Sequence, residues 1–347
     1  MSLTSHLSVP SSPVRRFLEE RFFIVTASAK GAPFSEQIGR ALGLPDIPRK
    51  PVRPPASRPQ FRAAVGTALD YRIRYILDGT APRKIVAAYG AALLTKAGVL
   101  ALPGHRVFAV SPKMRAYYGE PPLNAAPAAA LAESFFANHA ARLARLKPFE
   151  RRLTREEEGQ LIRDCVVLAY FEALYRAGLR INSPLYAVGT GASLDDLLAL
   201  PPEDVVADAC GLAEDAYEDV QPLLKLPASL NPVFDGSADA DFVIGSALFE
   251  VKTVSQFSPL DLRKCLLQLL GYTLLDYSDT FGIHSIAIWL TRQRHMSMWD
   301  IDGFLFPVSD LISGGQFAEA EVTARLSETR AAFREMLKSD VGETMPF

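Results

Sequence analysis

Two carboxylates and one ammonium group occur close together in the middle of this chain, at Asp241, Glu250 and Lys252. Two carboxylates that meet repel one another, and one pKa rises unless a cation fills the space between them. Lys252 can supply part of that positive charge, and a hard divalent ion such as Mg²⁺ can supply more. The alternative is a solvated ion pair at the protein surface, which would contribute little to stability.

A β-hairpin is the element that must position these three side chains. In residues 231–252, apolar alternation predicts two strands, about 240–244 and 247–253, around a Gly245-Ser246 turn. A tight turn at these two residues pairs Phe242 with Phe249, and therefore Asp241 with Glu250. Directly opposed side chains have Cβ atoms about 4.5–5.5 Å apart. Lys252 lies on the same face as Glu250, because side chains alternate along a strand.

The same stretch resembles the PD-(D/E)xK nuclease superfamily through GSADADFVI, LFEVKT and QLLGY, which follow in this order. The nearer likeness is to RecB-type exonuclease domains and related uncharacterised bacterial proteins. It is tight over residues 231–272 and diffuse elsewhere. The family builds its active site from an Asp, a D/E-x-K pair and a downstream Gln-x-x-x-Tyr. The matching positions are Asp241 or Asp239, Glu250, Lys252, Gln268 and Tyr272.

Two acids compete for the role of first metal ligand. The family's Gly-x-x-Asp spacing, counted from Gly236, favours Asp239. The tight-hairpin geometry favours Asp241, and by the same counting it puts Asp239 opposite Lys252.

The resemblance implies an α/β, restriction-endonuclease-like core in the order αβββαβ, a mixed sheet flanked by helices, with an N-terminal helical extension. It implies Mg²⁺ or Mn²⁺ held by Asp241, Glu250 and the Val251 carbonyl oxygen, with Asp239 and Glu172 as further ligands. The expected activity is metal-dependent hydrolysis of nucleic acid, DNA rather than RNA, in DNA repair or phage defence. The alternative is an inactive nucleic-acid-binding or scaffold protein that retains the nuclease fold.

Helices supply the remaining candidate residues. A helix over 260–275 places Gln268 and Tyr272 one turn apart on one face. A second helix begins after Thr154 with the capping signature TREEE and carries Glu172. Glu172 can instead form an ordinary i,i+4 ion pair with Arg176. A third helix, over 61–77, carries Asp70 where RecB-type nucleases have a metal-binding His; an Asp on the helix surface is the alternative. The residues expected to contact nucleic acid are Arg72, Arg74, Arg263, Lys264 and Arg292.

Charge and composition bound these expectations. The chain has 347 residues and a net charge of −2, but residues 1–100 hold 15 Lys and Arg against 6 Asp and Glu. A basic N-terminal third suits phosphate and an acidic remainder suits a metal ion. The three cysteines fall singly, which excludes zinc motifs and a four-cysteine iron–sulfur cluster and indicates a reducing cytoplasm. The five histidines form no HExxH motif, and neither a phosphate loop nor a GxSxG elbow is present.

These features predict a cytoplasmic protein, with no membrane span, whose partner is nucleic acid; a protein partner or a homo-oligomer stays open. We expect three segments: 1–60, an N-terminal helix and a Pro-rich basic arm; 61–150, a helical region; and 151–347, the nuclease core. A helix is also expected over 82–100. Loop and short helix are expected over 182–230. The nine acidic residues between Asp195 and Asp219 predict a solvent-exposed face there.

Overall fold

The structure of this chain is a computed structural model that describes residues 3–27, 50–78, 86–102, 107–119, 126–178, 182–234, 238–306 and 317–341. It divides into two compact units. The first joins Met1–Val52 to Leu223–Phe347, and the second is Arg53–Pro222. This division groups the chain differently from the three expected segments, because the helix that follows Thr154 belongs to the second unit and not to the unit with the sheet.

The first unit contains a five-stranded mixed sheet in the order β3-β6-β7-β8-β9. Strands β7 and β8 run parallel, and the other neighbouring pairs are antiparallel. A separate two-stranded sheet joins β4 to β5. The strands are β3 (Ala228–Leu230), β4 (Val233–Phe234), β5 (Ala238–Asp239), β6 (Phe242–Ile244), β7 (Ala247–Lys252), β8 (Ser285–Leu290) and β9 (His295–Asp300). The expected α/β class with a mixed sheet flanked by helices is therefore confirmed.

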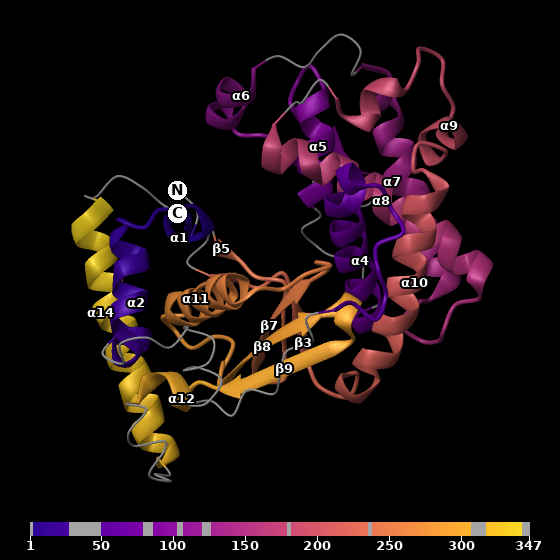
Figure 1. The fold of residues 1–347 in the computed structure, drawn as a ribbon. Coiled ribbons are helices and arrows are strands. Elements are labelled where there is room, and N and C mark those ends of the chain that lie inside the picture. The colour runs from indigo at the N-terminus through magenta and orange to yellow at the C-terminus, as the bar shows by residue number, and fades with distance from the viewer. Residues whose placement is uncertain are drawn as a thin grey trace. The chain divides into compact units, whose positions relative to one another are not determined.

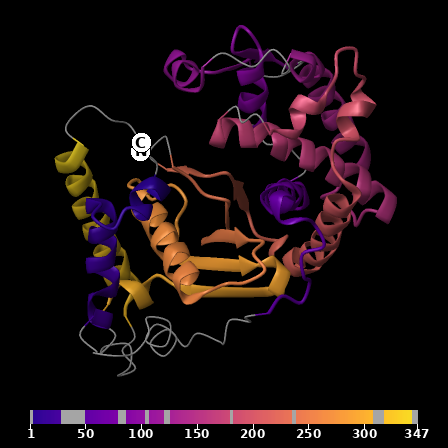
Figure 2. The same ribbon diagram turned by 45° about the horizontal axis from the view of Figure 1, so that its top comes forward.

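The first unit also contains helices. They are α1 (Leu3–Ser8), α2 (Pro13–Ala27), α11 (Pro259–Leu275), α12 (Asp302–Leu305) and α14 (Glu319–Val341), with short 3-10 turns at Gln221–Leu223 and Thr291–Gln293. Helix α11 contacts β7 and β8, and it also contacts α2 and α14. Figures 1 and 2 show α2 and α14 side by side, with α11 between them and the strands. Helix α11 is therefore the crossover connection between the parallel strands β7 and β8, as a parallel pair requires.

The predicted hairpin register is confirmed. Phe242 pairs with Phe249, Val243 with Leu248 and Ile244 with Ala247. Gly245 begins the two-residue turn with φ +61°, a left-handed conformation that glycine adopts without steric cost. Leu248 and Phe249 are fully buried on opposite faces of β7, so a slip by one residue would exchange the faces on which they pack.

The second unit is mainly helical. Its elements are the 3-10 turn Pro59–Phe61, α4 (Arg62–Leu77), α5 (Val86–Leu94), β1 (Val99–Ala101), β2 (Val107–Ala109), α6 (Pro112–Tyr118), α7 (Ala126–Leu146), α8 (Arg155–Ala177), the 3-10 turn Pro184–Ala187, α9 (Leu194–Leu198) and α10 (Glu203–Val220). Helix α8 contacts α4, α5, α7 and α10. Gly90 allows the approach of α5 to α8, because a Cβ there would lie 1.8 Å from the carbonyl oxygen of Phe171.

Two expectations about this unit are wrong. The helix expected over 82–100 ends at Leu94 within the described residues, and β1 follows after a turn in which Gly98 has φ +66°. The stretch 182–230 contains the 18-residue helix α10. Two of its acids are buried: Asp208 accepts hydrogen bonds from Ser57, and Asp215 pairs with Arg53 at 2.6 Å. These bonds also fix part of the Pro-rich segment on α10.

Within the described ranges, no helix combines the length and the apolar character needed to cross a membrane.

Candidate active site

Glu250 is the central residue of the candidate site. It lies on β7, and only 4% of it is exposed. Its Oε1 forms an ion pair with the Lys252 ammonium group, two residues along the same strand. Its Oε2 accepts a hydrogen bond of 3.1 Å from Gln268 Nε2 on α11. Both carboxylate oxygens of Glu250 are therefore held by residues that the sequence motif predicted beside it.

Helix α11 positions the polar pair behind Glu250. Ser258 caps the helix in a reciprocal capping box with Asp261. Gln268 and Tyr272, four residues apart, share one face, and Gln268 Nε2 lies 3.2 Å from the Tyr272 hydroxyl oxygen. The buried Tyr272 ring stacks on Phe234, with the centroids 5.6 Å apart. Packing of this ring therefore fixes the amide that contacts Glu250.

Asp241 lies just before β6, at the open end of the hairpin. Its Oδ2 accepts a hydrogen bond of 2.8 Å from the backbone N–H of Val251. Val251 stands between Glu250 and Lys252, so this bond holds the second carboxylate beside the D/E-x-K pair. The negative charge of Asp241 contributes to the raised pKa of Glu250.

Asp239 does not extend the hairpin. It is exposed and pairs with Val233 in the small β4–β5 sheet, so the expectation that it lies opposite Lys252 is wrong. The cause is a local change of pairing partner. Ala240 N donates to Pro232 O, and Asn231 N donates to Asp241 O. The backbone of residues 238–241 is thus held by residues 231–234, while the Asp241 side chain bonds to Val251 of β7. Gly236, from which the family spacing was counted, lies outside the described residues.

Burial and charge shift the protonation equilibria of this cluster. Burial and the nearby Asp241 charge raise the pKa of Glu250 to about 7, although Lys252 and Gln268 oppose the shift. Burial alone would lower the pKa of Lys252, but the Glu250 charge and other nearby groups outweigh burial and raise it. Burial, with the Glu250 charge, raises the pKa of Tyr272 to about 12, so its hydroxyl stays protonated at neutral pH. Lys252 thus pairs with Glu250, and Asp241 adds a second negative charge nearby.

The donor atoms here fit a hard divalent cation. The carboxylates of Asp241 and Glu250 and the carbonyl oxygen of Val251 are the oxygen ligands that Mg²⁺ prefers. Within the described part of the chain, no group of three or more His, Cys, Asp or Glu side chains is placed to hold a metal ion. Mg²⁺ sites commonly use one or two carboxylates, with water and substrate phosphate as the other ligands. A metal ion at these two carboxylates would therefore need water and substrate oxygens as its other ligands.

Glu172, the optional metal ligand, has partners of its own in the second unit. Its Oε1 pairs with Arg176 Nε at 2.5 Å, and its Oε2 accepts a hydrogen bond of 2.6 Å from the Tyr71 hydroxyl. The alternative reading, an i,i+4 pair with Arg176, is thus observed. Asp70 likewise pairs with Arg74 one turn further along α4.

The five predicted nucleic-acid contacts differ in exposure. Arg72, Arg74 and Arg292 are at least 95% buried, so none of the three offers an exposed guanidinium to a nucleic-acid backbone. Arg72 pairs with Glu158, Arg74 with Asp70, and Arg292 Nε donates to Thr253 O. Arg263 pairs with Glu19 at 2.7 Å and stays partly exposed, while Lys264 is exposed. In the first unit, contact with phosphate therefore remains a prediction for Arg263 and Lys264.

Cys265 is the neighbour of the site that sequence reasoning missed. It lies three residues before Gln268 on α11, and it is 3% exposed. Burial, together with the Glu250 charge and against the Lys252 charge, raises the pKa of its thiol to about 12. The signal available in the sequence was its i,i+3 spacing from Gln268, which places both on one helix face.

Comparison of the chain with protein-family models, with curated proteins and with solved structures found no match in any of the three.

Proposed function

We propose that this chain is a metal-dependent nuclease of the PD-(D/E)xK type. The observation that carries the proposal is the double engagement of Glu250, by Lys252 on its own strand and by Gln268 on α11. These residues are separated by up to 18 positions, yet they meet at one buried carboxylate. Asp241 and Tyr272 complete the set that the family's motifs require.

The order of elements around the site supports the same proposal. Strands β3, β6 and β7 are antiparallel neighbours, α11 follows, and β8 returns parallel to β7. This order agrees with the βββαβ part of the restriction-endonuclease-like core that the resemblance implies, with the β4–β5 hairpin between its first two strands. Residues of the D/E-x-K pair lie at the end of β7, the strand that contacts both β6 and β8.

In the proposed reaction, the residues of this chain orient the groups and balance charge. A divalent ion held by Asp241, Glu250 and the Val251 carbonyl oxygen would polarise the scissile phosphodiester and lower the pKa of a bound water. Lys252 would position that water by donating a hydrogen bond, and its positive charge would stabilise the negative charge that develops on the phosphate. Gln268 would keep the Glu250 carboxylate oriented, and Tyr272 would hold Gln268.

The first prediction concerns metal dependence. The purified full chain is expected to cleave nucleic acid with Mg²⁺ or Mn²⁺ and to lose cleavage when EDTA removes the metal. Labelled linear, circular and single-stranded DNA, with an RNA of the same sequence, would identify the substrate and separate end-dependent from internal cutting. Cleavage that is equal with and without EDTA, or absent on every substrate, would contradict the proposal.

The second prediction assigns the first metal ligand. Asp241→Asn is expected to reduce cleavage and Mg²⁺ affinity at least about tenfold, because an amide oxygen carries no charge to balance the ion. Asp239→Asn is the matched control, since Asp239 is exposed and two residues away. Its cleavage rate should stay within about twofold of the unaltered chain. The reverse outcome, with only Asp239→Asn inactive, would transfer the role to Asp239.

The second candidate function is an inactive nucleic-acid-binding or scaffold protein. One consequence of the same contacts favours it: because both Glu250 oxygens already have partners, Lys252 and Gln268, a metal ion would have to share or displace one of them. Calorimetry with Mg²⁺ separates the two functions. A nuclease should bind the ion in a manner that depends on Asp241 and Glu250, whereas a scaffold should bind nucleic acid and show no such metal site.

A further inference from the structure

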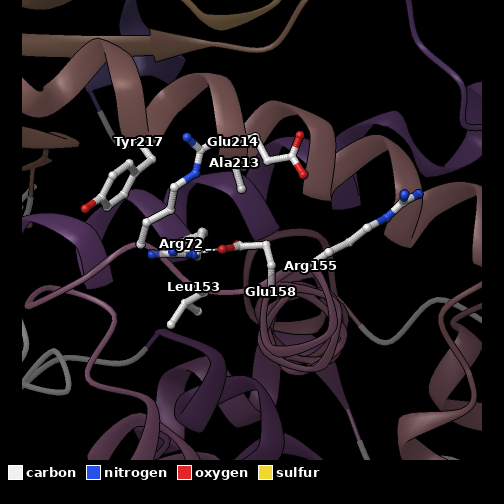
Figure 3. A pocket seen from close by; sticks show the side chains of 8 residues that line it. Arg72, Leu153, Arg155, Glu158, Ala213, Glu214 and Tyr217 are labelled. Atoms are coloured by element: carbon white, nitrogen blue, oxygen red, sulfur yellow. Dashed lines mark hydrogen bonds and ion pairs between the residues drawn. The ribbon is translucent and has the colours of Figure 1, made fainter.

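A small cavity lies within the second unit, where α4, α8 and α10 meet. Its volume is about 140 Å³, well above the space that one water molecule needs. Figure 3 shows Arg72 and Glu158 at its base, with Tyr217 and Glu214 projecting from α10 above them. None of these residues belongs to the Asp241–Glu250 site.

Arg72 supplies the main observation. Its Nε and Nη2 donate to the two oxygens of Glu158, at 2.7 and 2.9 Å. Its Nη1 is buried and has no hydrogen-bond partner among the described residues, and the side chain is 1% exposed. Buried guanidinium N–H groups are normally paired. An acceptor in the cavity that Arg72 lines would complete its hydrogen bonding.

The charge around the cavity favours a negative acceptor. Three arginines line it, Arg72, Arg152 and Arg155, against two acids, Glu158 and Glu214, and Arg152 also pairs with Glu218 at 3.6 Å. The Arg152 guanidinium lies over the Tyr217 ring, 6.0 Å from the centroid. In Figure 3 the Arg155 side chain extends away from Arg72, which leaves Arg152 as the second candidate donor.

We propose that this cavity binds a phosphate group, with Arg72 Nη1 and Arg152 as its charged donors. Guanidinium groups bind phosphate through short, charge-assisted hydrogen bonds, and several donors can share its oxygens. The shared chemistry allows two sources, a terminal phosphate of a nucleic acid or a free phosphorylated small molecule. The proposal does not depend on nuclease activity, because no group of the Asp241–Glu250 site takes part.

Titration calorimetry of the full chain with inorganic phosphate tests this site. EDTA in the buffer keeps divalent ions away from the Asp241–Glu250 site, so phosphate cannot bind there through a metal. The variant is Arg152→Glu, at a side chain that is 57% exposed, and the matched control is Arg145→Glu, at another exposed arginine of the same unit. Phosphate affinity is expected to fall at least about tenfold in Arg152→Glu and to stay unchanged in Arg145→Glu.

Absence of phosphate binding to the unaltered chain, or an equal affinity in the two variants, would overturn the proposal. The source of the phosphate is resolved with one oligonucleotide that carries a 5′-phosphate and the same oligonucleotide with a 5′-hydroxyl. Tighter binding of the phosphorylated form, lost in Arg152→Glu, identifies the end of a nucleic acid. Equal binding of both forms, with inorganic phosphate still bound, identifies a free phosphorylated ligand.

Discussion

Lys252→Ala is expected to reduce nucleic-acid cleavage by a factor on the order of 10² to 10⁴ while the chain stays folded. Lys252 is the only cation among the five residues of the D/E-x-K site, and Glu250 and Asp241 both act on its pKa. Without it, the water and the developing phosphate charge would lose their positive neighbour. Cleavage is measured under saturating Mg²⁺, so that weaker metal binding cannot imitate the loss.

The matched control is Lys338→Ala, at an exposed lysine on α14 of the same unit. It should cleave at the rate of the unaltered chain. Fluorescence of the two tryptophans, Trp289 on β8 and Trp299 on β9, reports whether the sheet stays folded. Lys252→Arg keeps the positive charge beside Glu250 and is a second variant for the same test. Unchanged cleavage in folded Lys252→Ala protein would rule out the proposed mechanism.

Glu158→Ala is expected to lower the free energy of unfolding of the second unit by about 3–5 kcal/mol. Glu158 binds two of the guanidinium nitrogens of Arg72, and the two side chains are 8% and 1% exposed. Removing the carboxylate leaves a buried positive charge without its counter-ion, which costs more than the ion pair itself contributes. Urea denaturation followed by far-UV circular dichroism would measure the loss, because this unit is mainly helical.

Two further variants separate this cause from a general effect of losing an acid on α8. Glu156→Ala removes an exposed acid from the same helical turn and should cost less than about 1 kcal/mol. Arg72→Met combined with Glu158→Leu removes both charges and should recover most of the loss. Tryptophan fluorescence serves as an internal reference, since both tryptophans lie in the first unit. If Glu156→Ala costs as much as Glu158→Ala, the buried charge is not the cause.

The hairpin and the helix after it could be predicted because their signals are local. Gly245 and Ser246 fix a two-residue turn, and the turn sets the register of Phe242 against Phe249. Helical periodicity places Gln268 and Tyr272 on one face of α11 in the same way. These short-range rules bring four of the five proposed site residues to known positions on two elements.

The sequence could not determine which polar residues pair with residues far away in the chain instead of facing solvent. Asp215 in α10 reads as a surface acid, but it pairs with Arg53, 162 residues earlier in the chain. By sequence pattern Asp239 continues the hairpin, yet it pairs with Val233, because residues 231–232 hold the backbone at Ala240 and Asp241. Such pairings depend on which elements approach one another in three dimensions, and periodicity within one element carries no information about them.

Glu250 shows both sides of this division. Its place on a strand, two residues before Lys252 and near the open end of the hairpin, follows from the sequence alone. Its burial, its hydrogen bond to Gln268 and the rise of its pKa to about 7 follow from the packing of α11 on β7 and the approach of Asp241. The sequence by itself determined the register of β6 on β7 and the face that Glu250 shares with Lys252. Tertiary packing decided how far they lose water, and loss of water sets the strength of their electrostatic interactions.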